Sequence, residues 1–244
     1  MSCAFCGEPF SKKRPRSKEH AWAQWLAQYL PNPVEKFRHI VSSPTGEVKA
    51  TWTDKDLAVI SKQICNPCNT GWMNDLENAA RPYLVTLMKG RGRTLYREAQ
   101  TVLGAWAVKT ALALQLAIPD AVRIPAEHYR AIYELKTKPP PKILIWLGAY
   151  EGWRHLWVSP HHLTLNFRDG SGRDAYETTL VVGHAVFQVF GHLNEDEVTW
   201  ERAARADVAT QIWPIRKDVQ FPPPAILTEA TLKTFSLPPT GNAA

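Results

Sequence analysis

The 244-residue chain holds four cysteines, which fall as two Cys-x-x-Cys pairs, Cys3/Cys6 and Cys65/Cys68. Two thiols at this spacing can present both sulfurs to one ion, and two such pairs complete the tetrahedron that Zn²⁺ adopts in structural sites. We therefore predict a structural zinc ion held by Cys3, Cys6, Cys65 and Cys68. An iron–sulfur cluster, two separate redox dithiols and buried free cysteines are the alternatives.

The stretch between the two pairs is longer than a simple zinc ribbon requires. It contains 58 residues, whereas ribbon spacings run to about 15–20. Something besides a minimal ribbon must therefore be held between the two pairs. A site closed by four sulfurs has no open position for a substrate, so this zinc would stabilise the fold and any chemistry would lie beside it.

Glu19, His20 and Asn69 are the residues near the cysteines that could do chemistry. The imidazole of His20 could accept a proton from water near neutral pH. The carboxylate of Glu19 and the carbonyl oxygen of Asn69 could bind a hard divalent cation. Each residue taken alone also fits an ordinary role, His20 as a surface histidine and Asn69 as a helix N-cap. A zinc ion that joins the two pairs would draw Asn69 toward the segment that carries His20.

Taken together, these residues resemble a known family over roughly residues 1–90. The pattern Cys3-x-x-Cys6…Glu19-His20…Cys65-x-x-Cys68-Asn69-x-Gly71-Trp72-Met73 looks like the zinc-stapled HNH endonucleases of the His-Me finger (ββα-metal) group. The resemblance implies that His20 is a general base and that Glu19 and Asn69 bind a catalytic Mg²⁺ or Mn²⁺. The activity it implies is metal-dependent hydrolysis of phosphodiester bonds in nucleic acid, with DNA favoured.

One position departs from the family pattern. The family's middle asparagine usually lies a few residues before the second cysteine pair, where this chain has Ile60. Asp56 could take the place of that asparagine, although at a different spacing. Glu77, two helical turns after Asn69, could be a substitute ligand, and a surface or capping carboxylate is the plainer interpretation. The alternative function is therefore a catalytically inactive, zinc-stabilised module that binds nucleic acid. A protein whose zinc only folds the N-terminus is the third hypothesis.

The positive charge lies in the half that carries the cysteines. The net charge is +6; residues 1–98 hold 15 Lys/Arg and 9 Asp/Glu, while residues 99–244 hold 14 of each. A basic segment of this kind suits a phosphate backbone, and a solvated surface is the plainer interpretation. If the chain acts as the resemblance to HNH endonucleases implies, the basic stretch at residues 12–18 would contact the phosphates that flank the cleaved bond.

The predicted fold class is α+β in two domains. A zinc-stabilised ββα-metal (HNH-like) domain is expected over residues 1–93, followed by an α+β domain over residues 94–244 in which helices precede an antiparallel sheet. The patterning predicts helices over 21–30, 97–118 and 126–136, and a hairpin that pairs 36–41 with 47–53. A further helix follows the second cysteine pair, and Pro82 is expected to kink it or to begin a second helix that runs to about residue 88. Strands are expected over 143–147, 156–158, 163–167, 178–190 and 209–213, and the Pro-rich tail is expected to be extended.

Composition narrows the class of protein further. With 45% apolar and 21% charged residues, the chain has the balance of a globular protein. No apolar run approaches the roughly 20 residues of a membrane-spanning helix. The N-terminal cations are not followed by an apolar stretch, so we expect no secretory signal and a cytoplasmic location. The ten tryptophans are interpreted mainly as core residues, and His155, His161 and His162 as structural ones.

Overall fold

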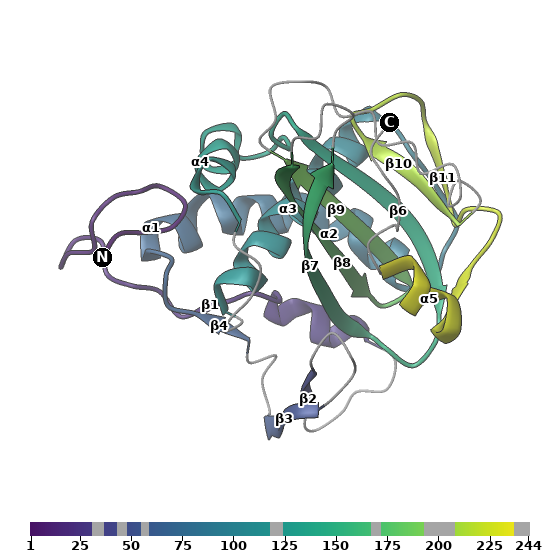
Figure 1. Ribbon diagram of the computed structural model, residues 1–244, viewed down its shortest axis with the longest axis horizontal. Coiled ribbons are helices and arrows are strands. Elements are labelled where there is room, and N and C mark those ends of the chain that lie inside the picture. The colour runs from purple at the N-terminus through teal and green to yellow at the C-terminus, as the bar shows by residue number, and fades with distance from the viewer. Residues whose placement is uncertain are drawn as a thin grey trace.

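The fold is built around a mixed sheet of six strands (Figure 1). The computed structural model describes residues 1–30, 37–42, 48–54, 59–117, 124–166, 172–192 and 208–236. Five antiparallel strands lie in the order β10–β6–β9–β8–β7, and β12 pairs in parallel with the end of β6. The strands are β6 (Ile143–Glu151), β7 (Leu156–Asn166), β8 (Gly172–Val182), β9 (Ala185–His192), β10 (Ala209–Trp213) and β12 (Leu227–Thr228).

Both faces of this sheet are buried, because alternate side chains enter two different cores. On β9, Phe187 and Val189 join the larger core, while Val186 and Phe190 join a smaller one. The larger core contains the buried faces of α2 (Asn74–Met88) and α3 (Arg97–Ala117). The smaller core includes Leu232 of α5 (Glu229–Ser236). The sheet is therefore the middle layer between two helical layers.

Helix α3 is the most deeply buried helix of the described chain. Every residue from Leu103 to Gln115 is buried. A helix that is apolar on all sides belongs inside a core, and α3 packs between α2 and the sheet. Helix α4 (Ala126–Leu135) follows it, and α2 continues through Pro82 without a break.

The N-terminal region forms a second, smaller unit around a short strand pair. Strand β1 (Glu19–His20) runs antiparallel to β4 (Ile60–Ser61). Between them lie the 3₁₀ helix η1 (Gln24–Tyr29) and the hairpin of β2 (Phe37–Ser42) and β3 (Val48–Asp54). After β4 the chain enters α1 (Asn66–Cys68), a π-helical turn η2 (Asn69–Met73) and then α2.

Several sequence predictions are confirmed and others are wrong. The α+β class, the antiparallel sheet, the hairpin and the helices at 97–118 and 126–136 are confirmed within a few residues. The single strand predicted over 178–190 is two strands, because the chain turns at Gly183, whose φ is +57°. The tail is not simply extended: it contains β12, α5 and β11 (Val219–Phe221), which pairs with β5 (Arg93–Leu95).

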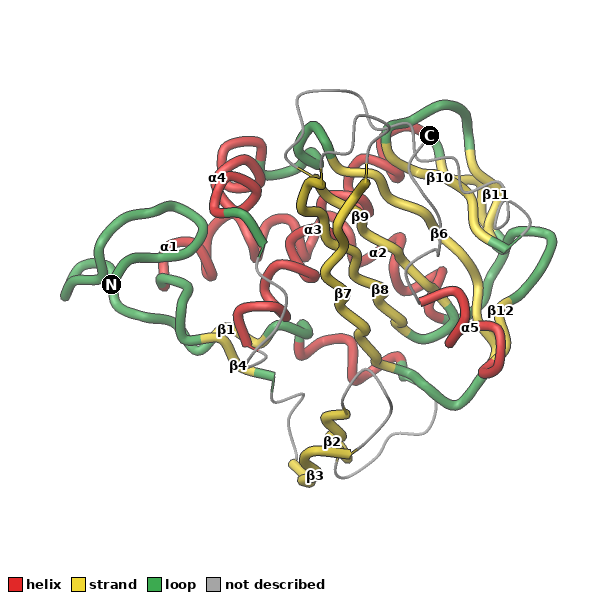
Figure 2. The backbone as a smooth tube through the Cα atoms, viewed as in Figure 1, coloured by secondary structure: helices red, strands yellow, loops and turns green. Residues whose placement is uncertain are grey.

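One continuous set of buried side chains joins the cysteines to the sheet through Trp72, Leu84, Trp106 and Phe187. Figure 2 shows the helices of this region in red and the strands of the sheet in yellow. The boundary expected near residue 93 stays a prediction, since packing across it does not say whether either part folds alone. In the described part of the chain, no helix combines the length and the apolar character that crossing a membrane would need.

Helix α4 is fastened to the sheet by a buried imidazole. Nδ1 of His128 lies 2.7 Å from the Tyr176 hydroxyl, and Nε2 lies 3.1 Å from the backbone oxygen of His192. Burial lowers the pKa of His128 to about 4. The native state therefore keeps this imidazole neutral at pH values where an exposed histidine would be charged.

Acidification should destabilise the protein through His128. The unfolded chain takes up this proton near its ordinary pKa of about 6.5, before the native state does. We expect the free energy of unfolding to fall as the pH drops from about 6.5 toward 4, by up to about 3 kcal/mol. Urea titrations of wild type and His128→Gln at several pH values check this. The advantage of wild type over the variant should shrink at low pH, and a constant difference would contradict the prediction.

Candidate metal centre

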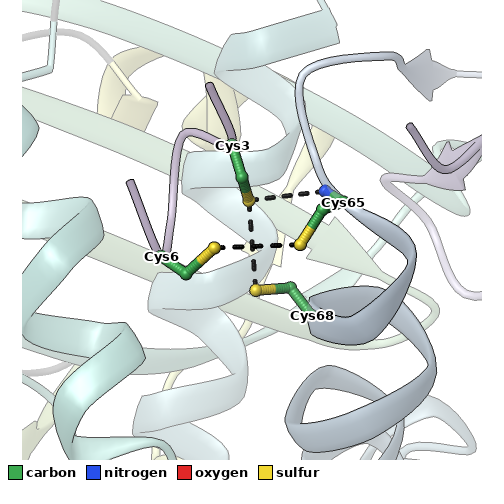
Figure 3. Close-up of side chains that lie close together, drawn as sticks. All are labelled: Cys3, Cys6, Cys65 and Cys68. Carbon is green, nitrogen blue, oxygen red and sulfur yellow. Dashed lines mark hydrogen bonds between the residues drawn. The ribbon is translucent and has the colours of Figure 1, made fainter. Parts of the chain in front are cut away.

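The four cysteine side chains converge on one point between the two Cys-x-x-Cys turns, which we call the first knuckle (Cys3–Cys6) and the second knuckle (Cys65–Cys68) (Figure 3). Their sulfur atoms all lie within 4.8 Å of one another, and all four residues are buried. The Sγ atoms of Cys3 and Cys68 are 3.9 Å apart, and those of Cys6 and Cys65 are 3.8 Å apart. Zn–S bonds of about 2.3 Å give a tetrahedron with edges of about 3.8 Å. The cluster therefore has the size and chemistry to hold one structural zinc ion.

Two sulfur–sulfur contacts each join one cysteine pair to the other pair. Cys3 meets Cys68 and Cys6 meets Cys65, so the pairs interlock across the site. Two independent dithiols would instead bring the sulfurs of one pair together. The geometry favours a single shared ion over two separate redox dithiols.

Backbone groups shape the first knuckle. The amide of Gly7 donates to the carbonyl of Cys3 over 2.9 Å, and Gly7 has a φ of +74°. A Cβ atom there would lie 2.7 Å from Nη1 of Arg130, which itself donates to the Cys6 carbonyl over 2.6 Å. The backbone N–H of Cys65 donates to the Cys3 sulfur over 3.3 Å. Glycine therefore serves both the turn and the close approach of α4.

Arg14 places a positive charge across the two pairs. Its Nη1 atom lies 3.7 Å from the sulfur of Cys6 and 3.5 Å from that of Cys65. The contact with Cys65 raises the pKa of Arg14. Four thiolates around Zn²⁺ leave a net charge of about −2, and Arg14 offsets part of it.

The buried thiols also influence one another. The hydrogen bond between the sulfurs of Cys3 and Cys68 lowers the pKa of Cys3 to about 4 and raises the pKa of Cys68. Burial raises the pKa of Cys6. The cluster thus favours a thiolate at Cys3, and because metals bind thiolates, loading the remaining thiols would release protons.

The strand that carries Glu19 and His20 runs beside the chain that enters the second knuckle. Glu19 is registered opposite Ser61, and His20 is registered opposite Ile60. Further backbone hydrogen bonds continue this pairing: Ser17 N–H donates to Ile64 over 2.8 Å, and Asn66 N–H donates to Pro15 over 2.8 Å. The side chains of Glu19 and His20, and the whole of Asp56, lie outside the described residues.

Asn69 is the C-cap of α1 and the first residue of η2, and the N-cap of α1 is Cys65. The side-chain amide nitrogen of Asn69 donates to the hydroxyl of Ser17, a buried residue shortly before Glu19. This contact ties the start of the helix to the segment that leads into β1. The contact uses the nitrogen of the side-chain amide, and the side-chain oxygen Oδ1 of Asn69 is the other end of that amide.

Glu77 has a structural task that the sequence did not reveal. One of its carboxylate oxygens accepts from the indole N–H of Trp25 over 3.2 Å, and the other pairs with Lys109. Lys109 is completely buried in α3. A lysine within an apolar helical pattern was the available signal, because such a charge needs a partner. Glu77 is therefore a half-buried carboxylate that links three elements, and its interpretation as a surface or capping carboxylate is wrong.

No protein-family model, curated protein or solved structure matches this chain.

Removing Arg14 should weaken metal retention. Arg14→Gln leaves the cysteines in place but deletes the cation that contacts both pairs, and loss of such an outer partner typically costs about 10–100-fold in metal affinity. Competition with a chromogenic zinc chelator measures the change. Arg16→Gln is the matched control, because the Arg16 side chain contacts Met1 and Phe10 and only its backbone, which the substitution keeps, pairs with Cys65. Equal zinc retention in the two variants would count against a role for Arg14.

Breaking the Lys109–Glu77 pair should destabilise the fold. Lys109→Met leaves the Glu77 carboxylate largely buried without its cation, which costs about 3–5 kcal/mol for pairs of this kind. Chemical denaturation should show that the Lys109→Met/Glu77→Gln double variant recovers part of the loss. Lys62→Met, at an exposed lysine, should have little effect. A double variant as unstable as the sum of the single ones would contradict coupling.

Proposed function

We propose that this protein is a metal-dependent endonuclease of the HNH type, which hydrolyses phosphodiester bonds of nucleic acid and favours DNA. The observation that carries the proposal is the pairing of the Glu19–His20 strand with β4, directly before the cysteine-bearing α1. Two antiparallel strands followed by a helix, joined by a four-cysteine site, match the pattern that the sequence resemblance implies.

The proposed chemistry assigns a separate task to each residue. His20 accepts a proton from water, whose oxygen attacks the phosphorus. The bond from phosphorus to the 3′ oxygen breaks, and the leaving oxygen takes a proton from solvent. Glu19 and the Asn69 carbonyl are the oxygen ligands that would hold Mg²⁺ or Mn²⁺. When bound, that cation would neutralise charge on the scissile phosphate and on the leaving oxygen.

Two features support this assignment. The Ser17 hydroxyl engages the amide nitrogen of Asn69, so the carbonyl oxygen is the end of that side chain left to bind a cation. The backbone N–H of Asn66 bonds to the Pro15 carbonyl, and that of Ser17 bonds to the Ile64 carbonyl. These two hydrogen bonds align the end of the basic stretch 12–18 with the strand of His20. Cations along that stretch would position flanking phosphates without reading sequence.

Ile60 favours the alternative, a module that binds nucleic acid without cleaving it. The register places Ile60 opposite His20, and an isoleucine side chain offers no hydrogen bond that could orient an imidazole. The two functions differ in one measurable respect, since only the nuclease depends on His20 for turnover.

Cleavage of supercoiled plasmid with added Mg²⁺ or Mn²⁺ tests the proposal. Wild type, His20→Ala and His162→Ala are compared after the zinc content of each has been measured. Removing a general base should slow cleavage at least about a hundredfold, with zinc retained. His162 is the matched control, because it is an exposed histidine on β7 beside Asp174. Equal cleavage by wild type and His20→Ala would refute the assignment.

Ile60→Asn separates the nuclease from the binding module if wild type does not cut. A side-chain amide opposite His20 should then produce His20-dependent cleavage if only orientation is missing. DNA binding without cleavage in both proteins would establish the binding module instead.

A further inference from the structure

Cations and aromatic rings alternate where η1 packs on α2. The guanidinium of Arg81 lies 5.1 Å from the ring centroid of Trp25 and 5.8 Å from that of Tyr29. The ammonium of Lys89 lies 5.2 Å from the Tyr29 ring. Nη2 of Arg81 also donates to the Tyr29 hydroxyl over 3.5 Å. Two rings from η1 are thus interleaved with two cations from α2 and its C-terminal end.

We call this interleaved set the cation–aromatic strip, which consists of Trp25, Tyr29, Arg81 and Lys89. All four side chains are exposed or half-buried. A separate cation–ring pair lies on another face of α2, where the guanidinium of Arg93 is 4.7 Å from the Tyr83 ring.

The strip lies in a stretch of uncompensated positive charge. Residues 78–97 contain five cations and no acidic residue: Arg81, Lys89, Arg91, Arg93 and Arg97. Within the residues that the structure describes, none of the five forms an ion pair with a carboxylate. Glu77, the acidic residue just before this stretch, is occupied by Lys109 and Trp25. Glu98 and Asp218 stand only at its border.

Interleaving with aromatic rings gives these cations an advantage as a recognition surface. A cation held over a ring keeps its charge and loses conformational freedom before a ligand arrives, so less ordering remains to be done on binding. Arginine in particular offers a planar fork to phosphate oxygens. The half-exposed rings are also suited to contacts with unpaired bases.

We propose that the cation–aromatic strip is a docking surface for a nucleic-acid backbone. DNA carries one negative charge per about 1.7 Å of duplex, which suits a row of cations that lack acidic partners. The surface is distinct from the basic stretch at 12–18. Arg81 lies seven residues into α2, about 10 Å along the helix from its first residue Asn74, so the strip would contact the duplex at a distance from the cysteine-bearing start of this helical region. The choice of nucleic acid as partner rests on the proposed function.

The test measures binding separately from cleavage. Fluorescence anisotropy with a labelled DNA duplex of roughly two helical turns is performed on full-length His20→Ala protein without added divalent cation. Arg81→Glu/Lys89→Glu reverses the two cations of the strip, and should weaken binding at least about tenfold and reduce the log–log salt slope by about two. Lys136→Glu/Lys233→Glu changes the same charge at exposed positions in α4's C-terminal end and α5, and should leave both values unchanged. Thermal unfolding confirms that all variants fold.

The outcomes distinguish this inference from the proposed nuclease activity. Selective loss of binding in the strip variant supports the docking surface, even if wild type cuts nothing. Equal binding by both charge-reversal variants overturns it, even if wild type cuts plasmid in a His20-dependent way. The inference is also overturned if the strip variant keeps the DNA affinity of the parent protein but no longer binds vesicles of phosphatidylserine and phosphatidylcholine that the parent binds. That result would assign the strip to a membrane surface.

Discussion

The convergence of four cysteine sulfurs to within 4.8 Å of one another is the constraint on which the N-terminal half depends. It joins residues 3–6 to residues 65–68, two segments that local structure alone would not bring together. Around it, the Phe5 ring meets Trp72 and Tyr129 edge-to-face. Because α1 starts inside the cluster, the same constraint sets where α2 begins and which way it runs. The Glu19–His20 strand is held in turn by its pairing with β4, which leads into the second knuckle.

A second, electrostatic connection carries that order into the body of the protein. Lys109 is completely buried in α3, and its partner Glu77 also accepts a hydrogen bond from Trp25. One carboxylate therefore links η1, α2 and α3. The cysteine cluster and the cation–aromatic strip occupy the two ends of the region that this carboxylate holds together. Neither surface can shift far without disturbing a buried charge, which is costly in a low-dielectric interior.

The parts of the molecule that could be predicted from the sequence are those formed by residues close to one another along the chain. The Cys-x-x-Cys spacing indicates a metal site because both sulfurs of a pair come from one turn, and α3 is marked by a long run of mostly apolar, helix-forming residues. The pairing of Thr94 with Gln220 joins strands of only three residues across most of the chain, so no local pattern marks it. The turn at Gly183 was missed because strand-like residues continue on both sides. The Lys109–Glu77 pair needed knowledge of which helices touch. The roles of Glu19, His20 and Asn69 stay predictions.

The long segment of chain between the two knuckles starts and ends at neighbouring positions, because β1 at its start pairs with β4 at its end. His20 and Ile60 face each other across β1 and β4, and Ala21 N–H bonds to the Val59 carbonyl over 2.8 Å. The ends of the hairpin segment are thus already closed by the surrounding architecture. Doubling the length of such a closed segment adds only about 0.6 kcal/mol of entropic cost. The stretch beyond η1 is therefore an insertion point, where a lineage or an engineer could exchange the hairpin for another module while the metal-binding frame keeps its shape.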